Sequence, residues 1–249
     1  MRIGLIGAGN MASALVRGWG DPVLVTDPVP GRAAALAADV GGEEVGSNAE
    51  LARRADAVIL CHKPPQLEAV AQAVAPHARA VVSILGGVPL AALRAAYPGL
   101  PVVRLLPSVP VEVRQGVTCH ARDPEADPEL ERRVLALFRR LGPVVSVEEA
   151  QLDAAMGLMS CAPAYLALVV EAQVDAGVRA GLPADVAADL VVSTLAGTGA
   201  LLRARDMDTL GVRRTVTSPG GSTARGLAAL ERRGLRAAFD EAMQAVLGR

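Results

Sequence analysis

The chain of 249 residues is long enough for one large domain or two modest ones, and its 51% apolar composition can supply a large core. Its formal net charge is -1, with acidic and basic residues interleaved along the whole length. This balance excludes a basic face for nucleic acid or for an anionic membrane, so we expect a small, weakly charged partner.

Short apolar runs typical of strands alternate with helical patterns through the first part of the chain. The predicted strands lie at residues 3–6, 23–26, 57–60, 80–84, 102–106, 116–120 and 143–147. Helical spacing of apolar residues fills the segments between them, as at residues 31–40, 66–75, 90–97 and 128–141. The alternation predicts an α/β fold with a Rossmann-type, doubly wound sheet that is mainly parallel and has helices on both faces.

The alternation stops after Val147, and nearly everything that follows has a helical pattern. We therefore predict two domains, a sheet domain at residues 1–148 and an all-helical C-terminal domain at residues 149–249. The helical segments 164–180 and 184–204 are apolar on more than one face, and such helices must be buried. We expect this second domain to serve dimerisation, giving a homodimer or a larger homo-oligomer built from dimers.

No segment has the pattern of a membrane span or of an export signal. The apolar stretches 166–174 and 186–202 contain Glu171 and Asp189, so neither reaches the uninterrupted length that a span needs. The first residues lack the features of a signal peptide, and we expect a cytoplasmic protein. Three widely separated cysteines without paired histidines predict neither a disulfide framework nor a metal site.

A glycine-rich turn connects the first predicted strand to the first helix. Its residues are Gly7, Ala8, Gly9, Asn10 and Met11. Glycine at the first and third positions permits a tight turn and a close approach of backbone to a diphosphate, while the helix N-terminus offers amide donors. The motif at this place in the fold predicts that the first domain binds a dinucleotide.

Asp27 ends the second predicted strand, where a carboxylate can accept hydrogen bonds from the adenosine ribose. The same charge repels a 2′-phosphate, which favours NADH over NADPH. Arg32 follows closely enough to reverse that preference, so the sequence indicates NAD(P)H as cofactor with only a lean to NADH.

Two further strand ends carry candidate cofactor residues. Lys63, the only lysine of the chain, follows the strand at residues 57–60 directly after His62. Because ligands bind at the carboxyl ends of the strands in such sheets, we assign both to the cofactor crevice. His62 at this position is a candidate acid or base, or a structural histidine. The next strand end contains Gly86 and Gly87, which can approach the nicotinamide.

A second glycine-rich segment opens a helix late in the chain. It contains Ser218, Gly220, Gly221, Ser222 and Thr223. The amides of a first helical turn are unpaired donors and the helix dipole adds positive charge, which together suit a small carboxylate. A helix capped by Ser or Thr after a Pro-Gly turn explains the same residues without any ligand.

The motifs together resemble those of the pyrroline-5-carboxylate reductase family. The segment 216–223 with the helix behind it is the most distinctive, and 7–11, Lys63-Pro64, 83–88 and 162–165 match in order and spacing. The likeness covers essentially the whole chain. It implies NAD(P)H-dependent reduction of 1-pyrroline-5-carboxylate to L-proline, the last step of proline biosynthesis.

The resemblance also implies roles for single residues. The substrate carboxylate would bind at residues 218–223, where the Thr223 hydroxyl would hold and polarise the imine nitrogen. We name Thr223 and Lys63 as catalytic residues. Asn48 would contact the adenosine side of the cofactor, and active sites would form at a dimer interface.

Three segments depart from the family pattern and keep other functions open. Residues 106–110 read Leu-Pro-Ser-Val-Pro where the family usually has Met-Pro-Asn-Thr-Pro, Arg213-Arg214 replaces Lys-Asp, and Ser-Cys-Ala stands at 160–162. The alternatives are a reductase of another cyclic imine, a 3-hydroxy acid dehydrogenase and a non-catalytic dinucleotide-binding protein. The absence of any lysine after Lys63 counts against the dehydrogenase.

Overall fold

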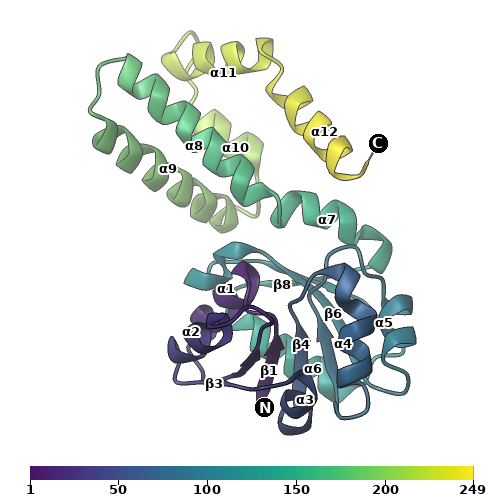
Figure 1. The fold of residues 1–249 in the computed structure, drawn as a ribbon. Coiled ribbons are helices and arrows are strands. Elements are labelled where there is room, and N and C mark those ends of the chain that lie inside the picture. Colours follow the sequence, from purple (N-terminus) through teal and green to yellow (C-terminus); the bar gives the residue numbers. More distant parts are fainter. Residues whose placement is uncertain (249) are drawn as a thin grey trace. The chain divides into compact units, whose positions relative to one another are not determined.

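The computed structural model describes residues 1–248 of the chain. The chain divides into two compact units, of which the first runs from Met1 to Pro163 and the second begins at Ala164. The first unit is built around a sheet, and the second consists of helices (Figure 1).

The sheet of the first unit has eight strands in the order β3-β2-β1-β4-β5-β6-β7-β8. Their bounds are β1 Ile3–Ile6, β2 Leu24–Thr26, β3 Glu43–Glu44, β4 Ala57–Leu60, β5 Val81–Ser83, β6 Val102–Pro107, β7 Thr118–Ala121 and β8 Val144–Val147. Strands β1 to β6 are parallel to one another, whereas β7 runs antiparallel to β6 and β8 runs parallel to β7. The mainly parallel, Rossmann-type sheet expected from the sequence is confirmed.

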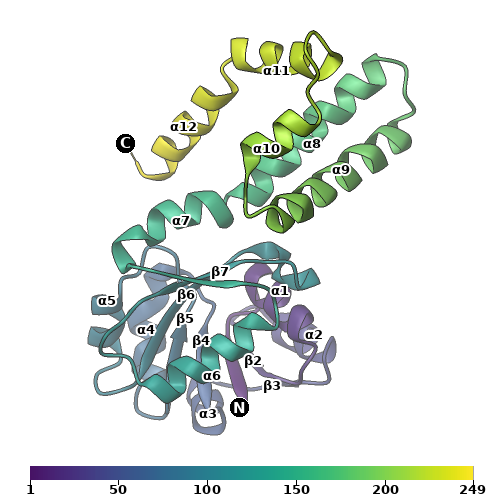
Figure 2. The same ribbon diagram turned by 180° about the vertical axis from the view of Figure 1, so that it is seen from behind.

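Helices cover both faces of this sheet. Their bounds are α1 Asn10–Trp19, α2 Arg32–Ala38, α3 Asn48–Arg54, α4 Leu67–Val74, α5 Leu90–Ala96, α6 Pro128–Arg139 and α7 Leu152–Met159, with 3₁₀ helices at Pro64–Gln66, Val109–Val113 and Glu149–Gln151. The apolar residues of α1, α2 and α6 form one core, and those of α3, α4, α5 and α7 form the other. Figure 2 shows α6 in front of the sheet.

Burial on both faces explains why most strands were readable from the sequence. Every residue of β1 and β4 is buried, and a parallel strand covered on both faces reads as a continuous apolar run. In the first core, Trp19 of α1 packs edge-on against Phe138 of α6 with ring centroids 5.4 Å apart. The exposed two-residue strand β3 was missed because its residues, Glu43 and Glu44, form no apolar pattern.

Helix α7 lies beyond residue 148 in sequence but packs within the first unit. Leu152 and Met159 of α7 belong to the second core, and the carboxylate of Glu149, just before α7, accepts a hydrogen bond of 2.6 Å from the amide of Leu90. The domain boundary drawn at residues 148 and 149 remains a prediction.

The second unit contains most of α8, whose bounds are Ala162–Arg179, together with α9 Ala184–Ala204, α10 Thr209–Thr215, α11 Ser222–Arg232 and α12 Leu235–Val246. Helices α8 and α9 lie side by side in both views (Figures 1 and 2). They approach closely where Gly177 faces Ala187, because a Cβ on that glycine would lie 3.3 Å from the Ala187 Cβ. Among the described residues of this unit, Ala187 alone is a buried apolar residue.

Two helical stretches are long and apolar enough to cross a membrane by length and composition alone. They are Glu149–Arg179 and Ala184–Ala204, and only 11% and 6% of their most apolar windows are buried in the structure. Exposed apolar helices of this kind must be covered by lipid or by other protein. From the sequence we expected that a second copy of the chain covers these helices in a dimer.

Candidate functional site

The ends of three strands bring the predicted cofactor residues to one edge of the sheet. Ile6 of β1 pairs with Thr26 of β2 on one side and with Leu60 of β4 on the other. The residues that follow these three strands therefore emerge together. The strand order changes direction between β1 and β4, which is where doubly wound sheets bind their ligands.

The turn between β1 and α1 uses its two glycines differently. Gly7 has a positive φ of 103°, and a Cβ on it would lie 2.8 Å from the carbonyl oxygen of Cys61, so no larger residue fits. Gly9 caps the N-terminus of α1 with extended backbone, and a Cβ there would meet nothing within 4 Å. The first glycine shapes the turn, and the second leaves its open side clear.

The carboxylate of Asp27 is part of the same turn. It accepts hydrogen bonds from the amide of Ala8 at 2.7 Å and from the amide of Val29 at 2.8 Å. The amide of Gly7 donates to the carbonyl oxygen of Thr26 at 2.8 Å. Two amides of the glycine turn are therefore bonded to residues at the end of β2, which leaves the later amides at the α1 N-terminus for a ligand.

A cavity of about 510 Å³ lies over the ends of β1, β2 and β4. Of the predicted residues, it is lined by Gly7, Gly9, Asp27, Asn48, His62 and Lys63. Asn48 is oriented by the Thr26 hydroxyl, which donates to its Oδ1 at 2.7 Å. This leaves the amide nitrogen of the Asn48 side chain as a donor at the cavity.

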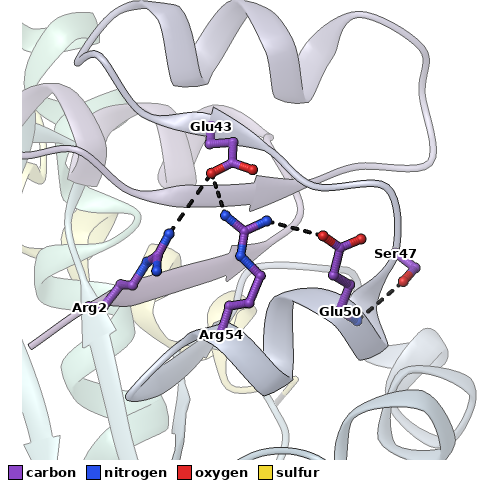
Figure 3. Close-up of polar contacts among 5 residues, drawn as sticks. All are labelled: Arg2, Glu43, Ser47, Glu50 and Arg54. Carbon is purple, nitrogen blue, oxygen red and sulfur yellow. Dashed lines mark hydrogen bonds and ion pairs between the residues drawn. The ribbon is translucent and has the colours of Figure 1, made fainter.

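A charged network fixes the start of α3, where Asn48 lies (Figure 3). The Ser47 hydroxyl caps the helix by accepting from the amide of Glu50 at 3.2 Å. Arg54 pairs with Glu50 at 3.1 Å and also with Glu43 of β3, which Arg2 approaches at 3.9 Å. The network connects α3 to β3 and to the start of β1, and so holds Asn48 at the cavity.

A second cavity of about 480 Å³ continues from the first toward the end of β5. Its predicted members are Gly9, Asn10, Met11, His62, Lys63 and Gly86. Gly86 lies against α7, because a Cβ on it would be 3.8 Å from the Met156 sulfur. Ala8 and Gly87 line neither cavity, although Gly87 has the positive φ of 73° that its turn requires.

His62 belongs to both cavities and has one ring nitrogen without a partner. Its Nδ1 lies 2.9 Å from the Lys63 carbonyl oxygen, which can only accept, so Nδ1 carries the proton. Nε2 is buried and has no hydrogen-bond partner among residues 1–248. Burial lowers the pKa of His62, and the ring is neutral at neutral pH with Nε2 as an acceptor.

Cys61 and Lys63 flank His62 with opposite properties. Burial raises the pKa of the Cys61 thiol, which keeps it protonated and a poor nucleophile. The Lys63 side chain is exposed and forms no ion pair within the described part of the chain. The crevice thus has an available cation and an inert thiol.

The altered segment at residues 106–110 faces the second cavity with an apolar residue. Ser108 is 2% exposed, and its hydroxyl donates to the Val117 carbonyl oxygen at 3.0 Å and accepts from the Val117 amide at 2.9 Å. Val109 lines the second cavity and is 46% exposed. The Ser108 hydroxyl is therefore used in bonds to the Val117 backbone and is not available to a ligand. Val109 offers no hydrogen-bonding side-chain group to the second cavity.

The predicted anion site at the start of α11 is exposed. Gly221 caps the helix without a side-chain hydrogen bond, so the capping by Ser or Thr that would explain the motif without a ligand is absent. A Cβ on Gly221 would lie 2.3 Å from the Ser218 hydroxyl oxygen, which explains the need for glycine. Ser218, Gly220, Ser222 and Thr223 are exposed.

Sequence reasoning missed Arg225, which lies at the same helix start. Its guanidinium donates to the Gly220 carbonyl oxygen at 2.5 Å and to the Ser222 hydroxyl at 3.2 Å. The spacing of three residues from Ser222 places both side chains on one helix face, which is a signal that the sequence contained. Arg225 adds a positive charge where a carboxylate was predicted.

Comparison with known proteins covers both units. A family model described as pyrroline-5-carboxylate reductase dimerisation matches residues 149–249, and one described as NADP oxidoreductase, coenzyme F420-dependent, matches residues 2–87. Pyrroline-5-carboxylate reductase of Synechocystis sp. is 33% identical over 258 aligned residues that cover 100% of this chain and 97% of the relative. The chain belongs to the pyrroline-5-carboxylate reductase family.

Solved structures of the family have the same fold. The enzyme of Streptococcus pyogenes superposes with a TM-score of 0.91 at 28% identity, covering 100% of this chain and 97% of that one. The Plasmodium falciparum pyrroline carboxylate reductase, solved with NADP bound, gives 0.89 at 25% identity over 99% and 95% of the two chains. The exposed helical unit of this chain, which begins at Ala164, lies inside the region matched by the dimerisation model, residues 149–249.

Proposed function

We propose that the protein reduces 1-pyrroline-5-carboxylate to L-proline with a reduced nicotinamide dinucleotide, as the last step of proline biosynthesis. The full-length membership in the pyrroline-5-carboxylate reductase family carries this proposal. In the reaction the imine carbon accepts a hydride and the ring nitrogen accepts a proton, which gives the secondary amine of proline.

The crevice of the first unit fits a dinucleotide. Gly9 faces open space at the start of α1, and the two connected cavities offer room on either side of it. When bound there, the cofactor supplies the hydride. Asn48 and Asp27 would hold the adenosine ribose.

The substrate would bind at the start of α11. Its carboxylate would accept from the first amides of the helix beside Gly220, Gly221 and Ser222, with the Ser218 hydroxyl adjacent. The Thr223 hydroxyl would donate a hydrogen bond to the imine nitrogen. This bond would orient and polarise the C=N bond. Lys63, which lines both cavities, would act on the cofactor side of the reaction, between the adenosine and nicotinamide halves of the crevice.

We further propose that NADH is preferred over NADPH. Asp27 lines the first cavity and already accepts two backbone hydrogen bonds, so its negative charge is fixed where a 2′-phosphate would approach. The P. falciparum relative was solved with NADP, so the preference is proposed for this chain from its own residue.

The active form is proposed to be a cytoplasmic homodimer or a larger assembly of dimers. The near absence of buried residues in α8 and α9, together with the matched dimerisation region, supports cover by a second copy of the chain.

The test is the initial rate of NADH oxidation with 1-pyrroline-5-carboxylate, with L-proline identified as the product. We expect turnover with this substrate and a lower kcat/KM with NADPH than with NADH. The apolar wall at Val109 favours one alternative, a reductase of another cyclic imine, so the same assay includes other cyclic imines. Turnover of those alone, or of 3-hydroxy acids in the reverse direction, would contradict the proposal.

A further inference from the structure

Arg32 lies where the two cavities of the crevice meet. It is the first residue of α2 and lines both cavities, as do Gly9, Cys61, His62 and Lys63. By contrast, Asp27 and Asn48 line only the first cavity. Residues shared by the two cavities mark the middle of the crevice.

The middle of the crevice corresponds to the diphosphate of a dinucleotide. The diphosphate joins the adenosine and nicotinamide halves, and it is placed at the glycine turn and helix N-terminus. Gly9, the helix cap with open space before it, is one of the shared residues. A side chain that lines both cavities, as Gly9 does, is therefore placed in the diphosphate region.

Most of the positive charge that a diphosphate needs in this region has to come from side chains. The amide of Ala8 donates to Asp27 and that of Gly7 to Thr26, so neither is available to a phosphate. Asp27 also places a negative charge nearby. The N-terminus of α1 contributes only about half a unit of positive charge against the two charges of a diphosphate.

Arg32 and Lys63 are the cations that meet this need. In the sheet order, β1 lies between β2 and β4, so Arg32 and Lys63, which follow β2 and β4, stand on opposite sides of the glycine turn. Within residues 1–248 neither side chain forms an ion pair, and both are exposed in the crevice. Their guanidinium and ammonium groups are thus available to a ligand.

We propose that Arg32 binds the cofactor diphosphate from the side opposite Lys63, and does not bind the 2′-phosphate of NADPH. The inference rests on the proposed function only in taking a nicotinamide dinucleotide as the ligand. It makes Arg32 a binding residue that NADH and NADPH share, and it leaves the discrimination between them to Asp27.

The test compares dissociation constants, measured by titration of the whole protein with NADH, NADPH and ADP-ribose. Arg32→Gln removes the positive charge. Arg32→Lys retains the charge but lacks the planar guanidinium with its paired N–H donors. Arg53→Gln is the matched control, since Arg53 is an exposed arginine of α3 that lines neither cavity. Thermal unfolding of each variant reports whether the fold is intact.

We expect Arg32→Gln to weaken NADH, NADPH and ADP-ribose by the same factor of about tenfold, the size of one lost charge-assisted hydrogen bond. The Arg32→Lys variant should lose less affinity for the three ligands than Arg32→Gln does. The Arg53→Gln variant should bind all three as tightly as the unaltered protein does. A loss confined to NADPH would assign Arg32 to the 2′-phosphate and overturn the proposal, as would unchanged binding of all three ligands.

The readout separates this inference from the proposed function. If ADP-ribose and NADH binding depend on Arg32 while 1-pyrroline-5-carboxylate is not reduced, the diphosphate assignment stands and the proposed reaction fails. If the unaltered protein binds none of the three ligands, the diphosphate assignment is wrong.

Discussion

The hydroxyl of Thr223 is the residue on which the proposed chemistry depends most. Thr223 is exposed in the first turn of α11, whose N-cap residue Gly221 offers no side-chain hydrogen bond. We predict that Thr223→Val lowers kcat by about 100-fold, because the imine nitrogen loses its oriented donor in the transition state. The dissociation constant of NADH should not change.

The matched control is Thr209→Val, which removes a hydroxyl from the first turn of α10 instead. Both variants are assayed for turnover and for NADH binding. Equal turnover in the Thr223 variant and the unaltered protein would refute the role of that hydroxyl.

The two glycines of the β1–α1 turn give a second prediction at the residue scale. Gly7→Ala should lower the free energy of unfolding by about 1–3 kcal/mol, because its φ of 103° is strained for alanine and the new Cβ meets the Cys61 carbonyl. Gly9→Ala should unfold like the unaltered protein but bind NADH about tenfold more weakly, since its methyl group projects into the open crevice.

Denaturant unfolding and NADH titration of both variants check this division of roles. Loss of stability in Gly9→Ala with unchanged NADH binding would contradict it. The glycine motif already predicted a tight turn at Gly7 and a close approach to the dinucleotide at Gly9, and the structure adds the positive φ and close contact of Gly7 and the open space at Gly9.

At the scale of elements, His120 of β7 connects three parts of the first unit. It is 3% exposed, with Nδ1 at 3.1 Å from the Ser146 hydroxyl of β8 and Nε2 at 3.1 Å from a Glu131 oxygen of α6. Burial lowers the pKa of His120, although the carboxylates of Glu131 and Asp123 oppose this effect and Arg122 adds to it. The folded protein therefore keeps this ring neutral.

The unfolded chain takes up the proton near pH 6.5, above the lowered folded-state pKa. The contribution of neutral His120 to the free energy of unfolding is therefore fully present above pH 6.5. It is lost as the pH falls from there toward the lowered folded-state pKa. We predict that the midpoint of thermal unfolding falls as the pH decreases from 7 to 5, and that His120→Asn reduces the slope. The control is His77→Asn, at an exposed histidine. A slope that His120→Asn leaves unchanged would contradict the prediction.

Elements were predictable where burial determines the pattern. β1 and β4 are continuous apolar runs because helices cover both faces of the sheet. The two glutamates of β3 give no such signal, and the reversed direction of β7 depends on pairing with β6, which a local pattern does not contain. Within the candidate site, strand ends identified Lys63 and Asp27, whereas the position of Arg32 between two cavities depends on the strand order.

At the scale of the whole molecule, the helical unit has too little core of its own. Leu190 and Leu195 of α9 are 55% and 41% exposed, and a soluble helix with such a surface requires a partner. We predict that the double substitution Leu190→Asp and Leu195→Asp raises the dimer dissociation constant at least about tenfold, because it places charges in an apolar interface.

Sedimentation at several protein concentrations measures this effect. Val113→Asp is the control, since it alters a more exposed apolar residue, which lies in the first unit. A double variant that remains as associated as the unaltered protein would show that α9 does not form the dimer interface. Sequence predicted this association from apolar helices alone, and it identified neither the contacting residues nor the number of subunits.

The central claim is that the start of α11 binds the substrate carboxylate and presents the C=N carbon to the cofactor. A crystal structure of the protein with L-proline and the oxidised dinucleotide tests it most directly. The account predicts the proline carboxylate within hydrogen-bond distance of the amides of Ser222 to Ala224, with the ring nitrogen at the Thr223 hydroxyl and its ring facing the nicotinamide. L-Proline bound elsewhere, with the α11 start remote from every nicotinamide in the assembly, would contradict it.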